Sequence, residues 1–273
     1  MTIVLGAVAY DAKVVPIWEG FGRAFERAGI AFDTVWFSNY ERQVDALLSG
    51  AVNVAWHSPL AWVQTRRLAE SRGRRARAIA MRDTDRDLRT AILVRSDSPI
   101  MNLEDLRDRR IAVGAVDSPQ ATLIPLLDLA ERGLEPGRDS RVRTFDVLVG
   151  KHGDHIGGER DAARALMAGE VDVACVLDSN QLLFSREGTL PAGSTRMLHA
   201  VGPYDHCNFT VVDEGLGNVE RVFVETLLAM DIADPEVGPL MEMEGLRRWL
   251  PARTSGYALI ERAVDRFGSR WAP

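Results

Sequence analysis

The sequence has little lysine, histidine and cysteine, and it has no long hydrophobic run. Its two cysteines, Cys175 and Cys207, are too few for a disulfide framework. No stretch of eighteen apolar residues occurs, so we expect no membrane insertion. The net charge of −6 gives no support to nucleic-acid binding. The hydrophobic content of 46% and the charged content of 26% are typical of a globular protein.

The first residues, 1-MTIVLGAVAYDAKVV-15, predict a strand rather than a secretion signal. They lack a basic stretch before the apolar run, and they lack a cleavage signature. If the natural protein begins at this methionine, a cytoplasmic location is expected. If a leader has been removed, a periplasmic or extracellular location is expected instead.

Strands and helices alternate along the first seventy residues. In residues 15–28 the apolar positions recur at helical spacing, with Pro16 near the start and Gly29 after the end. Such alternation predicts an α/β fold with parallel strand pairing. Strands are expected at 2–9, 31–37 and 51–56, and helices at 15–28, 39–50 and 59–70.

An arginine-rich segment follows, because residues 66–89 contain nine arginines and four acidic residues. We interpret it as a solvated helix end and loop, and the alternative is a docking patch. The alternation then resumes. Strands are expected at 90–96, 111–115, 142–149, 171–178, 196–202 and 208–213, and helices at 103–110, 120–133, 159–169, 217–231, 237–249 and 254–267.

An internal repeat divides the chain into two similar halves. The segment 46-ALLSGAVNVAW-56 aligns with 165-ALMAGEVDVAC-175, and each reads as a helix, a glycine that ends it, and a buried strand. In open α/β sheets, ligands bind beyond the carboxyl ends of the strands. We therefore expect His57 and Ser58 in the first half, and Asp178 in the second, to face a shared cleft.

Three segments carry a resemblance to a known family. They are 40-YERQVDALLSGAVNVAWHSPLAWV-63, 113-VGAVDSPQATLIPLLDL-129 and 150-GKHGDHIGGERDAARALMAGEVDVACV-176. The chain resembles the phosphonate-binding branch of the type II periplasmic-binding-protein fold. That resemblance implies two Rossmann-like lobes joined by two crossover segments, with a ligand between lobes that close by hinge motion. Lobe 1 would be residues 1–86 plus 205–273, and lobe 2 would be residues 87–204.

The resemblance and the strand-end argument together select the ligand-binding candidates. The family's oxyanion loop corresponds here to residues 117–122, which keep two hydroxyl groups at a helix start. The expected ligand is a small anion or a small polar organic molecule, and an ABC permease would be the partner of an exported protein. The candidates are Tyr10, Lys13, His57, Ser58, Asp117, Ser118, Gln120, Thr122, Lys151, His152 and Asp178.

Histidine and cysteine side chains also suggest a metal site at the same loops. Imidazole and thiolate groups suit iron, zinc, copper or nickel. A divalent ion of this kind is the only cofactor that these residues indicate, with Asp154 or Asp205 as a further ligand or an orienting group. The predicted metal ligands are His57, His155, His206 and Cys207.

Two alternatives to a solute receptor stay open. The first is a cytoplasmic enzyme on the same scaffold, because the chain is distantly similar to the thiamin-pyrimidine synthase; its metal-dependent form would use the histidines and Cys207. The second is a regulatory ligand sensor without chemistry of its own. A structural role for each histidine, such as capping a helix, competes with all of these readings. Cys175 ends a strand of apolar character and is expected in the core.

Overall fold

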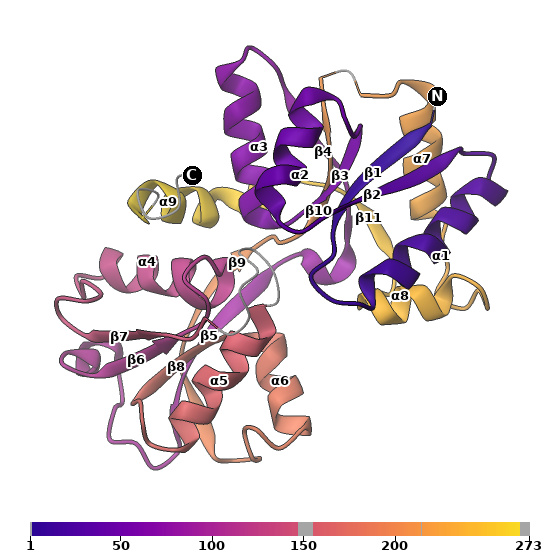
Figure 1. Ribbon diagram of the computed structural model, residues 1–273. Coiled ribbons are helices and arrows are strands. Elements are labelled where there is room, and N and C mark those ends of the chain that lie inside the picture. Colours follow the sequence, from indigo (N-terminus) through magenta and orange to yellow (C-terminus); the bar gives the residue numbers. More distant parts are fainter. Residues whose placement is uncertain (1, 147–154, 214, 268–273) are drawn as a thin grey trace. The chain divides into compact units, whose positions relative to one another are not determined.

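The computed structural model describes residues 2–146, 155–213 and 215–267 (Figure 1). The chain divides into two compact units. Unit 1 comprises Met1–Arg86 and Asp205–Tyr257, and unit 2 comprises Asp87–Tyr204 and Ala258–Pro273. The chain passes from unit 1 to unit 2 after residue 86, returns to unit 1 after residue 204, and ends in unit 2 from residue 258 onward.

Unit 1 is built on a six-stranded sheet with the order β11-β4-β10-β3-β1-β2. β1 runs parallel to β2 and β3, whereas β10 is antiparallel to β3 and β4, and β11 is antiparallel to β4. The ends of β1 to β4 therefore share one edge with the starts of β10 and β11, and we name it the carboxyl edge of unit 1. The strands are β1 Ile3–Val8, β2 Phe32–Phe37, β3 Val54–His57, β4 Ala76–Arg82, β10 Asn208–Val212 and β11 Trp249–Pro251.

Helices cover both faces of this sheet (Figure 1). One face packs against α1, α7 and α8 around an aromatic core that includes Trp18, Trp56 and Phe209, with ring centroids 4.8–5.8 Å apart. The other face packs against α2 and α3. The helices are α1 Val14–Arg27, α2 Tyr40–Ser49, α3 Pro59–Ser71, α7 Asn218–Leu228 and α8 Gly238–Glu244, with a 3-10 turn η1 at Asp83–Asp85 and another, η4, at Ser255–Tyr257.

Unit 2 has a five-stranded sheet with the order β7-β6-β8-β5-β9. β6 runs parallel to β7 and β8, while β5 is antiparallel to β8 and β9. The ends of β6, β7, β8 and β9 thus share one edge with the start of β5, the carboxyl edge of unit 2. The strands are β5 Leu88–Arg95, β6 Arg110–Val113, β7 Arg141–Thr144, β8 Val173–Leu177 and β9 Thr195–Tyr204.

The helices of unit 2 explain why the end of the chain belongs to it. α5 and α6 pack on one face of the sheet, and α4 lies beside α9. Arg262 and Arg266 of α9 pair with Glu131 and Glu135 at 3.1 Å and 2.8 Å. α9 also packs against η3 and β9, and these contacts together with the surface ion pairs place it in unit 2. The elements are η2 Leu103–Leu106, η3 Pro119–Leu123, α4 Ile124–Glu131, α5 His155–Met167, α6 Asp178–Arg186 and α9 Ala258–Phe267.

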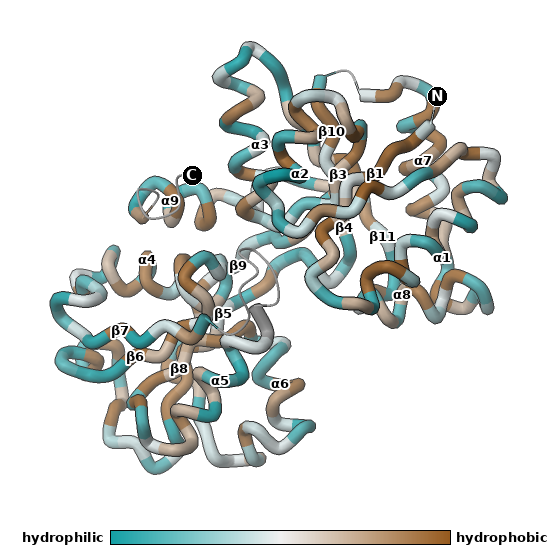
Figure 2. Tube along the Cα trace, in the orientation of Figure 1, coloured by the Kyte–Doolittle hydropathy of each residue, from teal (hydrophilic) through white to brown (hydrophobic). Residues whose placement is uncertain are grey.

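The internal repeat is a real structural equivalence. Gly50 and Gly169 end α2 and α5 with positive φ angles of 80° and 74°, a conformation that glycine adopts without strain. Asn53 then accepts a hydrogen bond from Val4 N at 2.8 Å, and Asp172 accepts one from Arg110 N at 2.8 Å. In each unit one polar residue thus ties the start of a central strand to its parallel neighbour. Figure 2 shows that β1 and β8 are coloured mainly as hydrophobic.

Four parts of the chain differ from the sequence expectation. The arginine-rich segment contains β4, where a loop was expected, and residues 178–186 form α6. The helix expected at 237–249 splits into α8 and β11, and that expected at 103–110 is only the short turn η2. β4 could not be predicted from the local sequence, because acidic residues far along the chain neutralise its arginines. Arg77, for example, pairs with Glu220 at 2.8 Å.

Candidate functional site

His57 ends β3 and is completely buried, with 0% of its surface exposed. Neither ring nitrogen has a hydrogen-bond partner among the described residues. Burial lowers the pKa of the imidazole to about 3, so the ring is neutral at physiological pH. Side chains alternate along a strand, so His57 shares the α2 and α3 face with Ala55 and points away from Trp56. The sequence placed it at a ligand; the structure places it in the interior of unit 1.

A buried cluster of charges lies at the end of β4. The guanidinium of Arg82 donates to both oxygens of Asp85, at 2.6 Å and 2.9 Å, and to a carboxylate oxygen of Glu244 at 3.1 Å. Burial opposes ionisation of Asp85, but the charge and hydrogen bonds of Arg82, helped by His206, outweigh it and lower the pKa to about 2. For Glu244 burial prevails, and its pKa is raised despite Arg82. The cluster is an ion pair with a second carboxylate attached to the same cation.

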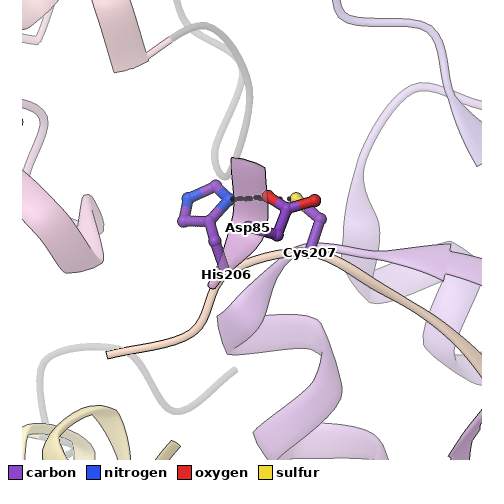
Figure 3. A group of neighbouring side chains, drawn as sticks. All are labelled: Asp85, His206 and Cys207. Atoms are coloured by element: carbon purple, nitrogen blue, oxygen red, sulfur yellow. Dashed lines mark hydrogen bonds and ion pairs between the residues drawn. The ribbon is translucent and has the colours of Figure 1, made fainter. Parts of the chain in front are cut away.

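His206 and Cys207 lie directly beside this cluster, at the start of β10 (Figure 3). The imidazole Nδ1 is 3.1 Å from Cys207 Sγ and 3.5 Å from Asp85 Oδ1. Cys207 is 6% exposed, and burial followed by the charge of Asp85 raises the pKa of its thiol well above the usual range. Three donor atoms of three kinds, nitrogen, sulfur and oxygen, all lie within 4.8 Å of one another.

The loop after β1 presents exposed side chains at the same edge of unit 1. Tyr10 is 42% exposed, and Asp11 and Lys13 are exposed beside it. Asp11 accepts a hydrogen bond from Lys13 N at 2.9 Å and shapes the start of α1. Lys13 also lies close enough to act on the carboxyl of Glu244. These side chains are available to a solute.

The carboxyl edge of unit 2 carries the loop that resembles an oxyanion site. The Ser118 hydroxyl accepts a hydrogen bond from Ala121 N at 3.2 Å and caps the following helical turn. The Thr122 hydroxyl donates to Ala115 O at 2.7 Å, so it can only accept from a ligand. Ser58 has the same capping role in unit 1, where it accepts from Ala61 N at 3.2 Å. The hydroxyl groups of Ser58, Ser118 and Thr122 therefore form hydrogen bonds within their own loops.

A buried glutamate organises the same edge of unit 2. Glu159 accepts hydrogen bonds from Leu177 N at 2.7 Å, Asn180 Nδ2 at 3.0 Å and Gln120 Nε2 at 3.2 Å. It holds the starts of η3 and α6 at fixed positions beside α5. Asp117 is buried next to Ser118, and Asp178 begins α6.

The structure brings some of the predicted residues together and separates others. His206 and Cys207 are neighbours, as the metal hypothesis requires, but His57 is not part of their group, and Asp85 is the third member. Asp205, predicted as a further metal ligand, is occupied by two hydrogen bonds from Arg253, at 2.7 Å and 2.6 Å. Lys151, His152, Asp154 and the side chain of His155 lie outside the described residues.

Sequence reasoning missed Arg82, Asp85, Glu159 and Glu244. The spacing of Arg82 and Asp85, three residues apart, was a weak signal inside a segment full of charge. Glu244 comes from an element more than 150 residues further on, so no local pattern could connect it. His199, given no role, lies 3.1 Å from Asp128 in unit 2. In the described part of the chain, no helix has the length and apolar character needed to cross a membrane.

Two α/β units that gather polar side chains at the carboxyl edges of their sheets have the build of a solute-binding protein. Residues 8–257 match the family described as ABC transporter, phosphonate, periplasmic substrate-binding protein. The chain belongs to this family, and it is a solute-binding receptor of the type that serves ABC transporters. A comparison with curated proteins found no match.

Solved structures of similar fold include the following three. PhnD1 from Prochlorococcus marinus, in complex with methylphosphonate, is 15% identical with a TM-score of 0.71, and 98% of each chain is covered. XAC2383 from Xanthomonas citri, bound to ATP, is 20% identical with a TM-score of 0.72, again with 98% of each chain covered. The aliphatic sulphonate binding protein SsuA from Escherichia coli is 16% identical with a TM-score of 0.61, covering 100% of this chain and 94% of that one. These similarities confirm the predicted type II periplasmic-binding-protein fold.

Proposed function

We propose that this receptor binds a small polar organic molecule that carries an amine or another hydrogen-bond donor group. The observation that supports this ligand class is the presence of carboxylates at both carboxyl edges, among the residues that the structure describes. In unit 1, Arg82 is shared by Asp85 and Glu244, and the exposed Lys13 lies beside Asp11. In unit 2, Asp146 and Asp178 lie at the corresponding edge.

A fully ionised phosphonate fits such an environment poorly. Like charges repel at short range, and this repulsion costs more free energy in a buried site than in an exposed one. An amine on the ligand would instead be attracted, and Lys13 would still bind an acidic group. A zwitterion satisfies both kinds of partner, and Tyr10 offers an exposed aromatic surface for its carbon chain.

We further infer that the receptor works on the outer side of the cytoplasmic membrane and delivers its ligand to an ABC permease. The description of the family as periplasmic supports this location. It stands against the cytoplasmic expectation, which rested only on the first residues of the sequence. Fractionation of cells that express the natural gene would decide between the two locations.

The ligand class is tested by thermal unfolding with matched pairs of compounds. Ethylphosphonate is compared with 2-aminoethylphosphonate, and ethanesulfonate with taurine, since each pair differs only by an amine. A ligand at a hundred times its Kd adds about 2.7 kcal/mol and raises Tm by roughly 5–11 °C. We expect the amine-bearing member of a pair to give the larger shift. Equal shifts, or a preference for the compound without an amine, would contradict this ligand class.

A substitution of Lys13 tests whether the ligand contacts the loop after β1. Lys13→Met should weaken a ligand with an acidic group by about tenfold, since it removes one exposed charge-assisted hydrogen bond. The matched control is Arg23→Met, an exposed cation on the same helix, which should leave binding unchanged. If both variants bind as the wild type does, the ligand does not contact the loop after β1.

A further inference from the structure

We propose that Asp85, His206 and Cys207 form a binding site for a divalent transition-metal ion of the zinc type, with three protein ligands and one open position. The ligand atoms are Oδ1 of Asp85, Nδ1 of His206 and Sγ of Cys207 (Figure 3). The site does not depend on the proposed solute, and it differs from the ligand set expected from sequence by replacing His57 and His155 with Asp85.

The distances suit a metal. Zinc lies about 2.0–2.2 Å from nitrogen and oxygen ligands and about 2.3 Å from sulfur, which puts tetrahedral donors roughly 3.3–3.6 Å apart. Here Nδ1 lies 3.1 Å from Sγ and 3.5 Å from Oδ1. Small rotations of the His206 and Cys207 side chains would open this triangle enough to admit an ion.

The same geometry disfavours a nucleophilic cysteine. In a Cys-His-Asp relay, one ring nitrogen contacts the thiol and the other contacts the carboxylate. In this protein a single nitrogen, Nδ1 of His206, lies next to both Cys207 and Asp85. Burial also raises the pKa of the Cys207 thiol, whereas a nucleophile needs a lowered pKa. Convergence of all three groups on one point is the arrangement of metal ligands.

The surroundings hold the donors in place. His206 N donates to Asp85 O at 2.8 Å, which ties the two ligand-bearing segments together. Tyr257 donates its hydroxyl to His206 O at 2.8 Å. Arg82 fixes the carboxylate of Asp85 through two hydrogen bonds, as orienting partners do in metal sites. The ligands are therefore positioned before any ion arrives.

The net charge of the cluster formed by Arg82, Asp85 and Glu244 favours the binding of a cation. Asp85 and Glu244 share the single positive charge of Arg82, so their sum is about −1 with both carboxyls ionised. Binding of a divalent ion replaces the Cys207 thiol proton: the S–H bond breaks, a metal–sulfur bond forms, and one proton leaves to solvent. The net addition of +1 neutralises the cluster, which offsets the cost of burying its charges.

The test uses reduced, chelator-treated full-length protein without a histidine tag. Co²⁺ serves as an optical probe, because a thiolate ligand gives it a charge-transfer absorption. We expect one Co²⁺ per chain, displaced by Zn²⁺, with release of one proton per ion. Cys207→Ser should abolish the charge-transfer band, and His206→Gln should weaken Zn²⁺ binding at least tenfold.

Two controls use the matching residues of unit 2. Cys175→Ser and His199→Gln should bind Co²⁺ and Zn²⁺ as the wild type does. Circular dichroism verifies that each variant is folded, and if Cys207→Ser is not, His206→Gln decides alone. No band with folded wild-type protein, a band that survives in Cys207→Ser, or Zn²⁺ affinity within twofold of wild type in His206→Gln would each overturn the site.

Discussion

Replacing the buried His57 by leucine should make unit 1 less sensitive to acid. The unfolded imidazole has a pKa of about 6.5, whereas the folded one has a pKa of about 3 because of burial. Below pH 6.5 the unfolded state binds the proton and the folded state does not. The contribution of His57 is therefore present above the unfolded pKa, and it is lost as pH falls from about 6.5 toward 3.

The size of the effect follows from these two pKa values. Between pH 7 and pH 5 the unfolded imidazole gains most of a proton, which lowers the free energy of unfolding by roughly 2 kcal/mol. By pH 4 the loss reaches about 3 kcal/mol. His57→Leu removes this pH-dependent loss of stability. At pH 7 the variant should be as stable as the wild type or more stable by about 1–3 kcal/mol, because it removes a buried polar group without a partner.

Urea unfolding followed by tryptophan fluorescence measures this change. The signal reports mainly on unit 1, which contains five of the six tryptophans, Trp18, Trp36, Trp56, Trp62 and Trp249. His199→Gln in unit 2 should leave the pH dependence of this signal as it is in the wild type. If His57→Leu and the wild type lose equal stability between pH 7 and pH 5, the imidazole is not buried in its neutral form, and the reasoning fails.

Two further predictions concern the buried charges. Arg82→Met leaves Asp85 and Glu244 without their shared cation, so it should lower the free energy of unfolding of unit 1 by about 3–5 kcal/mol in the same urea assay; a loss below 1 kcal/mol would contradict the ion-pair account. Glu159→Gln replaces one acceptor oxygen by an NH2 donor that faces the donors Gln120, Leu177 and Asn180, and it should destabilise unit 2 by about 2 kcal/mol. Labelling of the buried Cys175 thiol should then be roughly thirtyfold faster; an unchanged rate would show that the glutamate does not hold the unit together.

The repeat is the part of the fold that the sequence predicts best. A helix, a glycine and a buried strand are local patterns, and Gly50 and Gly169 end their helices as expected. β4 was not predictable in this way. Its arginines look solvated in the sequence, and only the folded chain brings Glu220 to Arg77 and Glu244 to Arg82.

The residues of the candidate site also fall into two groups. Local sequence patterns identify some of them, and only the fold brings the others together. Adjacent His206 and Cys207 could be selected because rare residues at a strand start are visible in the sequence. The direction in which the His57 side chain points could not be predicted in this way. A shift of the strand by one residue reverses the face on which a side chain lies. Asp85 joins the cluster only because antiparallel pairing brings the end of β4 to the start of β10.

We expect this receptor to bind a small polar solute and to leave it unchanged. The most direct measurement is calorimetric titration of the purified protein with the best amine-bearing compound, followed by recovery of that compound and mass spectrometry. We predict one molecule bound per chain, recovered intact after hours of incubation at saturating concentration. Conversion of the compound into a product, in an amount exceeding that of the protein, would contradict the receptor and favour the enzyme.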